Sequence, residues 1–221
     1  MNVFGVKKEN GQYKMRNNIV VLCEARTGSN FLCELFYCFE PINVLGEFFL
    51  ETEDKNPVYA FNELKDTNHV IKIINTQITD YNLDFMFDMP NTHYIILERT
   101  NKLEQLASLK VAQNLQKWYG VDTSDMKIHI DPIEYKNFCI SSVQNYTYLR
   151  EKTSDKNVLE INYEDDILNI DLPNTLHKIH SWLGEHDILL NYTNFVPMYN
   201  KKQNNSNIHD VIVNYSELHH E

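Results

Sequence analysis

Short apolar runs alternate along the chain with longer stretches whose apolar residues recur at helical spacing. Residues 18–23, 69–74 and 93–97 are apolar runs rich in β-branched side chains, and they lack regular polar alternation. This pattern is typical of strands that are buried on both faces of a parallel sheet. Weaker apolar runs at residues 42–45 and 158–161 predict two further strands.

Helical periodicity fills the stretches between these runs. Pro132 suits the first turn of one helix, and Gly184 suits the C-terminal cap of another. Strands that alternate with helices predict an α/β fold, a three-layer sandwich with a central parallel sheet of about four to five strands. No internal repeat or low-complexity linker interrupts the alternation, so we expect a single domain over residues 1–221. The expected helices cover residues 29–39, 57–66, 103–118, 132–152 and 174–183.

Composition and charge disfavour several classes of function for this chain. The chain has 221 residues, of which 43% are hydrophobic, enough for one sizeable core. Its formal net charge of -11 disfavours nucleic-acid binding, which normally requires a basic surface, and also disfavours a long polyanionic substrate. The sequence contains no apolar run near the ~20 residues of a membrane span, and its first residues lack the apolar core of a signal peptide. We therefore expect a cytoplasmic protein without a membrane span.

The first loop has the chemistry of an anion-binding site. After the first strong strand, the chain continues with Arg26, Thr27, Gly28, Ser29 and Asn30 and then enters a helix. Free N–H groups at a helix start favour anions, Gly28 permits close approach of the backbone, and Arg26 offers fork geometry for phosphate or sulfate oxygens. The alternative is an ordinary helix cap with Arg26 on the surface. The loop lacks the G-x-x-x-x-G-K-[ST] pattern of a Walker A sequence.

A second arginine follows the third strong strand. Arg99 stands at the end of that strand, and Ser108 comes nine residues later on the next helix. A guanidinium and a hydroxyl are suitable donors for a dianionic phosphate. The alternative is a solvated Arg99 with the Ser108 hydroxyl bonded to its own backbone. Because ligands of α/β sheets bind at the carboxyl ends of the strands, we expect both loops at one edge of the sheet.

The two loops resemble those of the PAPS-dependent sulfotransferases, where PAPS is 3′-phosphoadenosine 5′-phosphosulfate. Residues 26–32 look like the loop of that family that binds the 5′-phosphosulfate, and the leading arginine resembles the bacterial carbohydrate sulfotransferases. Arg99 and Ser108 stand where the family holds the 3′-phosphate. Weaker similarities extend the resemblance over most of the chain and include a Tyr-Glu-Asp turn at residues 163–165.

The resemblance implies a P-loop NTPase-like sulfotransferase fold. Its nucleotide-binding core would span residues 18–118, and a helical part, a late strand and a C-terminal loop would span residues 119–221. The resemblance also implies PAPS as the donor, 3′,5′-adenosine bisphosphate as the product, and no metal. It implies that residues 26–30 bind the donor and that Lys201 and Lys202 close over its phosphates. The alternative for these two lysines is a plain surface run.

Three side chains are candidates for the chemistry itself. Sulfuryl transfer is an in-line displacement, so the protein must position the reactants, stabilise charge and remove the proton of the acceptor. We expect Arg26 to stabilise the transferred group and the leaving phosphate. The resemblance implies that Glu47 is the general base, although the proline often found in that region is missing; a loop carboxylate or a partner of Arg26 is the alternative. Lys72 lies in an apolar strand and needs a partner. The resemblance implies that it points toward the sulfate, and the alternative is a lysine at an exposed sheet edge.

The sequence therefore predicts a sulfotransferase that moves a sulfuryl group from PAPS to a hydroxyl of a small, carbohydrate-like acceptor. The loops at residues 48–66 and 119–131 are expected to shape the acceptor pocket. The first alternative is a P-loop small-molecule kinase, although the Gly-Lys-Ser/Thr pattern and a strand-end aspartate for magnesium are missing. The second alternative is a catalytically inactive relic that binds the nucleotide without turnover.

Overall fold

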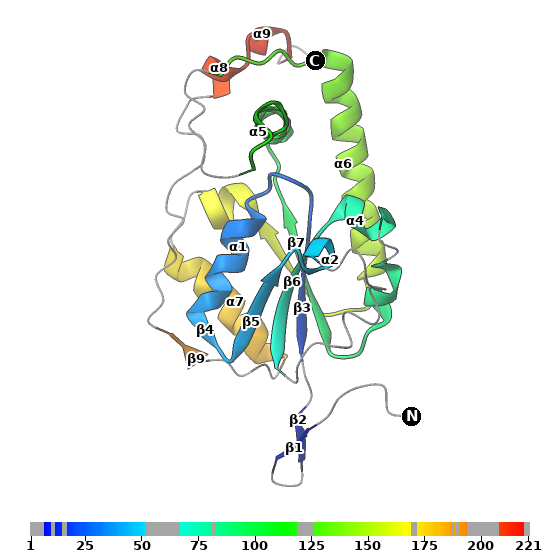
Figure 1. The fold of residues 1–221 in the computed structure, drawn as a ribbon, viewed down its shortest axis with the longest axis vertical. Coiled ribbons are helices and arrows are strands. Elements are labelled where there is room, and N and C mark those ends of the chain that lie inside the picture. The colour runs from blue at the N-terminus through cyan, green and yellow to red at the C-terminus, as the bar shows by residue number, and fades with distance from the viewer. Residues whose placement is uncertain are drawn as a thin grey trace.

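Five parallel strands form the central sheet of the protein (Figure 1). The computed structural model describes residues 7–9, 12–14, 17–51, 67–80, 83–118, 126–168, 172–186, 188, 191–193 and 208–218. All neighbouring strands of the sheet run parallel, so the predicted α/β sandwich around a parallel sheet is confirmed. The strands are, in spatial order, β5 (Ile42–Gly46), β6 (Asn68–Ile74), β3 (Asn18–Cys23), β7 (Thr92–Glu98) and β8 (Val158–Asn162).

The register of the three central strands brings their carboxyl ends to one level. Cys23, the last residue of β3, lies opposite Ile74 of β6 and Leu97 of β7. The loops that follow these strands consequently emerge side by side at one edge of the sheet, where ligands bind in α/β folds. Because β3 is the middle strand, its loop lies between the loops of β6 and β7.

Helices cover both faces of the sheet and its carboxyl edge (Figure 1). None of the described helices combines the length and the apolar character that crossing a lipid bilayer requires. The helices are α1 (Ser29–Leu35), α2 (Phe48–Glu51), α4 (Asn75–Asp80), α5 (Lys102–Leu115), α6 (Pro132–Lys152), α7 (Leu172–Glu185), α8 (Ile208–Val211) and α9 (Tyr215–Leu218). The smaller elements are the strands β1 (Lys7–Glu9), β2 (Gln12–Lys14), β4 (Phe39–Glu40) and β9 (Asn191–Tyr192), and the helical turns Phe36–Cys38, Leu83–Asp88 and Tyr163–Leu168.

Three of the expected helices need comment. The first ends at Leu35, because the chain tightens into a turn and then enters β4. The last long helix, α7, continues through Gly184 to Glu185. Gly184 therefore does not cap this helix, and the positive φ angles of described glycines occur at Gly28 and Gly46 instead. The helix expected at residues 57–66 lies outside the described residues.

Alternate side chains of the strands pack into two hydrophobic cores, one on each face of the sheet. Val21 of β3 packs with α1 and α7 on one face of the sheet. Val20 and Leu22 pack with α2, α4 and α6 on the opposite face. This period of two is what a strand covered on both faces requires, and it explains why the strand sequence is continuously apolar.

A third apolar cluster holds α5 at the carboxyl edge of the sheet (Figure 1). Leu106 of α5 packs in this cluster with Ile130 and with Ile212 of the C-terminal segment. The Asn214 side chain joins the two segments, since it accepts a hydrogen bond from the N–H of Ile130 at 3.1 Å and donates one to its carbonyl oxygen at 2.8 Å. Packing from two directions therefore fixes the helix that carries Ser108.

A buried histidine lies at the opposite, amino-terminal edge of the sheet. His93, near the start of β7, is 6% exposed, and its Nδ1 lies 3.3 Å from Nδ2 of Asn157. Its ring centroid is 5.4 Å from that of His186. Burial, and after it the neighbouring His186, lower the pKa of His93 to about 4.

Replacing this histidine should weaken the acid sensitivity of the fold. The pKa of His93 is about 4 in the folded chain against an ordinary value of 6.5, so its neutral form stabilises the fold fully above pH 6.5 and that contribution is lost as the pH falls through 4. We expect the Tm of the wild type to fall more steeply across this window than the Tm of His93→Gln. Scanning fluorimetry measures the difference, with exposed His177→Gln as the control. Parallel curves for the wild type and His93→Gln would contradict this prediction.

Candidate functional site

The loop that joins β3 to α1 contains two left-handed residues. Arg26 has a φ of 65° and Gly28 a φ of 82°, and Gly28 stands directly before α1. Thr27 between them is fully buried, and its hydroxyl donates to the carbonyl oxygen of Glu24 at 2.9 Å. No side chain of the described residues caps the start of α1, so the loop is not the ordinary helix cap of the alternative interpretation. The loop turns tightly. Its side chains contact two different elements, because Arg26 bonds to Ser108 of α5 and Asn30 bonds to Lys72 of β6.

The Arg26 side chain points toward the second predicted loop. Its Nε donates to Oγ of Ser108 at 2.9 Å, and its Nη1 donates to the carbonyl oxygen of Trp118 at 2.7 Å. Burial, and after it the charge of the neighbouring Arg99, lower the pKa of Arg26. The structure thus brings Arg26 together with Ser108, which lies 82 residues further along the chain. The resemblance implies that Ser108 binds the 3′-phosphate together with Arg99, and this stays a prediction.

Arg99 is buried against the same loop. It is 6% exposed, and it donates from Nη1 to the carbonyl oxygen of Arg26 at 3.2 Å and from Nη2 to Glu104 at 2.5 Å. Its Nε lies 3.8 Å from Oε1 of Glu164 and has no hydrogen-bond partner among the described residues. Arg99 is therefore not the solvated residue of the alternative interpretation, because it holds the backbone of the β3–α1 loop.

Tyr163 closes the loop from the side of β8. Cζ of Arg99 lies 4.5 Å from the centroid of the Tyr163 ring. A Cβ atom added to Gly28 would stand 2.7 Å from two carbons of that ring, so only glycine permits this contact. Burial raises the pKa of Tyr163. In the sequence, Tyr163 was noted only as part of the resemblance. Its position directly after β8, a strand of the same sheet, could have indicated that it lies near the β3–α1 loop.

Glu164 fixes the loop that follows β7. Its carboxylate accepts hydrogen bonds from the backbone N–H groups of Thr100 at 2.9 Å and Asn101 at 3.0 Å. Burial acts to raise the pKa of Glu164, but the hydrogen bonds outweigh it and lower the pKa. Asn101 in turn caps α5 by accepting from the N–H of Glu104 at 3.0 Å. The start of α5 is therefore held at a fixed position beside the β3–α1 loop.

A second cation lies on the β6 side of the loop. Nζ of Lys72 lies 2.6 Å from Oε1 of Glu47 and donates to Oδ1 of Asn30 at 2.5 Å. Gln77 donates to the other carboxylate oxygen of Glu47 at 3.1 Å. The alternative of a lysine at an exposed sheet edge is wrong, because β6 lies between two other strands and Lys72 is only 4% exposed. Glu47 is the partner of this lysine.

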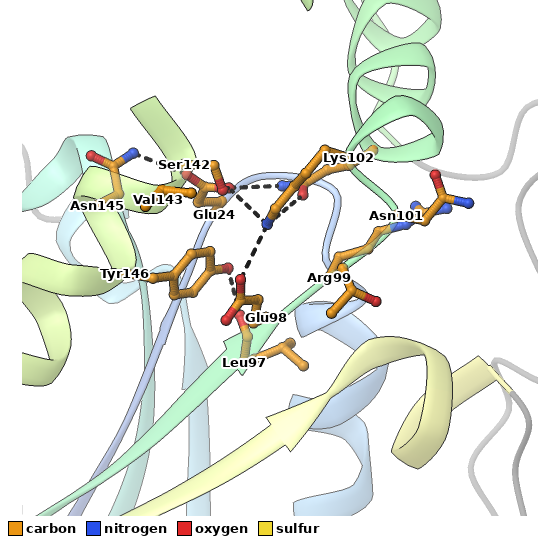
Figure 2. Close-up of polar contacts among 12 residues, drawn as sticks. Glu24, Leu97, Glu98, Arg99, Asn101, Lys102, Ser142, Val143, Asn145 and Tyr146 are labelled. Carbon is orange, nitrogen blue, oxygen red and sulfur yellow. Dashed lines mark hydrogen bonds and ion pairs between the residues drawn. The ribbon is translucent and has the colours of Figure 1, made fainter. Parts of the chain in front are cut away.

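Glu24 is a buried carboxylate that the sequence did not single out (Figure 2). It is the first residue after β3 and is 8% exposed. It accepts hydrogen bonds from Oγ of Ser142 at 2.8 Å, Nδ2 of Asn145 at 2.9 Å and Nε2 of Gln105 at 3.1 Å. These donors lie 81 or more positions away in the sequence, so no local pattern could have indicated them.

The remaining predicted site residues divide into two groups. Ser29 and Asn30 begin α1, and Ser29 is 7% exposed. Lys201 and Lys202 lie outside the described residues. The same holds for residues 52–66 and 119–125, which make up most of the two loops expected to shape the acceptor pocket.

The chain shares its fold with a solved bacterial sulfotransferase. The crystal structure of a sulfotransferase from Alicyclobacillus acidocaldarius matches with a TM-score of 0.54 and 12% sequence identity, over 85% of this chain and 86% of that chain. The crystal structure of mouse sulfotransferase SULT7A1 complexed with PAP matches with a TM-score of 0.45 and 14% identity, over 81% of this chain and 69% of that chain. No protein-family model and no curated protein sequence matches the chain. The first likeness confirms the predicted sulfotransferase fold.

Gly28→Ala should destabilise the protein through both its backbone and its new side chain. The φ of 82° costs a non-glycine residue about 1–2 kcal/mol, and the added Cβ would also stand 2.7 Å from the Tyr163 ring. Gly46→Ala is the matched control, because Gly46 has a φ of 58° but the added Cβ would meet no atom within 4 Å among the described residues beyond its two chain neighbours. We expect urea unfolding to give a larger loss of stability for Gly28→Ala than for Gly46→Ala. Equal losses would show that the contact with Tyr163 is not tight.

Proposed function

We propose that this protein transfers a sulfuryl group from PAPS to a hydroxyl of a small, carbohydrate-like acceptor. The observation that carries the proposal is the presence of two cationic groups on either side of the β3–α1 loop. Arg26 lies with Ser108 on one side, and Lys72 lies with Asn30 and Glu47 on the other. PAPS carries a 3′-phosphate and a 5′-phosphosulfate on one ribose, so it needs two anion sites close together. The fold shared with the sulfotransferase from Alicyclobacillus acidocaldarius agrees with this function.

In this proposal Arg26 and Ser108 bind the 3′-phosphate. A guanidinium and a hydroxyl at 2.9 Å from each other offer several donors to one phosphate. Arg99, which the sequence predicted for this role, has two nitrogens engaged with Arg26 and Glu104. We therefore assign to Arg99 the support of the loop and a positive charge near the 3′-phosphate. The contacts of Arg26 favour the 3′-phosphate over the transferred group that the sequence suggested.

The 5′-phosphosulfate would lie against Gly28, Ser29 and Asn30 and the ammonium group of Lys72. Left-handed residues within a turn arrange successive backbone N–H groups into a concave site for anions, and the loop contains two of them. Thr27 contributes through its buried hydroxyl, which fixes the turn. We further propose that Lys201 and Lys202 close over the phosphates of the bound donor.

Glu47 is the proposed general base of the reaction. Its carboxylate takes the proton of the acceptor hydroxyl as the acceptor oxygen bonds to sulfur and the bond from sulfur to the 5′-phosphate oxygen breaks. The product that leaves is 3′,5′-adenosine bisphosphate. Lys72, 2.6 Å from Glu47, supplies the positive charge that stabilises the developing negative charge on the transferred group. In this proposal the base and the electrostatic stabiliser are the two members of one ion pair.

The nucleotide preference separates a sulfotransferase from a kinase. We expect 3′,5′-adenosine bisphosphate to raise the Tm by roughly 5–10 °C at a hundredfold excess over its Kd, and ATP with magnesium to raise it much less. Ser108→Ala should reduce the shift with the bisphosphate and leave the shift with adenosine 5′-monophosphate unchanged, because only the bisphosphate carries a 3′-phosphate. A shift with ATP and magnesium alone would favour the small-molecule kinase.

Glu47→Gln should separate binding from turnover. Because the amide cannot accept the proton, we expect transfer of labelled sulfate to fall by about a hundredfold or more, whereas the Kd of 3′,5′-adenosine bisphosphate changes little. Glu40→Gln, on the exposed residue of β4, is the control. A screen of labelled-sulfate transfer over candidate hydroxyl compounds identifies the acceptor for this assay. Unchanged turnover in Glu47→Gln would remove Glu47 as the base, and binding without transfer to any acceptor would favour the inactive relic.

A further inference from the structure

We propose that Glu24 is a positioning residue that sets the distance between the two phosphate sites. The inference rests on the proposed function, because it concerns the 3′-phosphate site at Ser108 and the 5′-phosphosulfate site at the β3–α1 loop. Glu24 stands two residues before Arg26, and its carbonyl oxygen accepts from the hydroxyl of Thr27 at 2.9 Å. It links the end of β3 and α5, which carry the two proposed sites, to α6 (Figure 2).

The contacts of Glu24 join three elements at one carboxylate. Oε2 accepts from Gln105 of α5 at 3.1 Å and from Ser142 of α6 at 2.8 Å, and Oε1 accepts from Asn145 of α6 at 2.9 Å. Gln105 is fully buried and Ser142 is 1% exposed, so water does not replace these bonds. A buried carboxylate without its donors is costly, which ties the positions of the three elements to one another.

A cation lies in the same cluster as Glu24 and is shared with a second carboxylate. Nζ of Lys102 lies 3.9 Å from Glu24 and 3.6 Å from Glu98, and it stands 4.8 Å from the centroid of the Tyr146 ring. The Tyr146 hydroxyl donates to the carbonyl oxygen of Leu97 at 2.8 Å. The cluster therefore connects the last residues of β7 and the first turn of α5 to the face of α6, as Figure 2 shows.

Two hydrogen bonds link the surroundings of Glu24 to the proposed phosphate sites. The carbonyl oxygen of Glu24 accepts from the hydroxyl of Thr27, and this bond shapes the turn at Gly28. The Nε2 of Gln105 also donates to the carbonyl oxygen of Ala25 at 2.9 Å, directly before Arg26. Gln105 precedes Ser108 by three residues, about one helical turn. The same amide thus holds both the start of the loop and the turn of α5 that carries Ser108.

The affinity of a ligand that occupies both sites depends on the distance between them. The bisphosphate 3′,5′-adenosine bisphosphate occupies both sites, whereas adenosine 5′-monophosphate and adenosine 3′-monophosphate each occupy one. If the loop and α5 lose their fixed spacing, the bisphosphate must order them on binding, and its advantage over the monophosphates decreases. A loss of stability alone would change all three affinities alike or none of them.

The test compares these three ligands by isothermal titration calorimetry, with Glu24→Gln and Ser142→Ala. We expect Ser142→Ala to weaken bisphosphate binding by roughly tenfold, as for the loss of one hydrogen bond to a charged group, and each monophosphate by less than about threefold. Glu24→Gln should show a larger loss of the same kind. Ser141→Ala, the exposed neighbour on α6, is the matched control and should retain the wild-type affinities. Circular dichroism confirms that each variant is folded at the temperature of the titration.

The outcomes separate this inference from the proposed function. If the wild type does not bind the bisphosphate more tightly than either monophosphate, the proposed function fails and the inference fails with it. If the wild type shows that preference but Ser142→Ala retains it, the inference alone is overturned. A loss of the preference in Ser142→Ala and not in Ser141→Ala supports the positioning role of Glu24, and Ser142→Ala decides the matter even if Glu24→Gln does not fold.

Discussion

The site depends on one constraint, the common level at which β6, β3 and β7 end. Cys23 lies in register with Ile74 and with Leu97, so three loops begin within one strip of the sheet edge. Arg26 meets Ser108 across 82 residues only because this register places the β3–α1 loop beside the start of α5. A slip of one residue in either pairing would also turn the apolar side chains to the wrong core. The packing that fixes the cores therefore also fixes the site.

The polar side chains at this edge are held chiefly by one another. Lys72 lies against Glu47, Arg99 lies against Glu104, and Glu24 collects its donors from two helices. Buried ion pairs of this kind contribute little net stability, because desolvation offsets most of the attraction. They do make the arrangement specific, since any displacement leaves a buried charge without its partner. The formal net charge of -11 is thus compatible with a local group of cations whose positions are fixed by carboxylates.

The sequence predicted the strands more fully than the site. Continuous β-branched runs identify β3, β6 and β7, because burial on both faces leaves no room for polar alternation. The position of the β3–α1 loop was also predictable, because Gly28 stands between a predicted strand and a predicted helix; its binding of an anion stays a prediction. The hydrogen bonds from Arg26 to Ser108 and from Gln105 and Ser142 to Glu24 were not predictable, because each joins residues 81 or more positions apart and depends on how α5 and α6 pack. The prediction that Gly184 ends its helix was wrong, because a glycine cap requires a positive φ and Gly184 does not have one.

The proposed function gives the two arginines of the site different tasks, and their described contacts also differ. Arg99 is bordered by Glu104 and Glu164, so part of its charge is already compensated within the protein. Arg26 contacts a hydroxyl and a carbonyl oxygen, and both burial and the charge of Arg99 lower its pKa. A phosphate dianion beside Arg26 would oppose both effects, because it attracts the protonated guanidinium and offsets the charge of Arg99. In the proposed function, a doubly charged ligand group beside Arg26 would therefore offset the repulsion between the two neighbouring guanidinium groups.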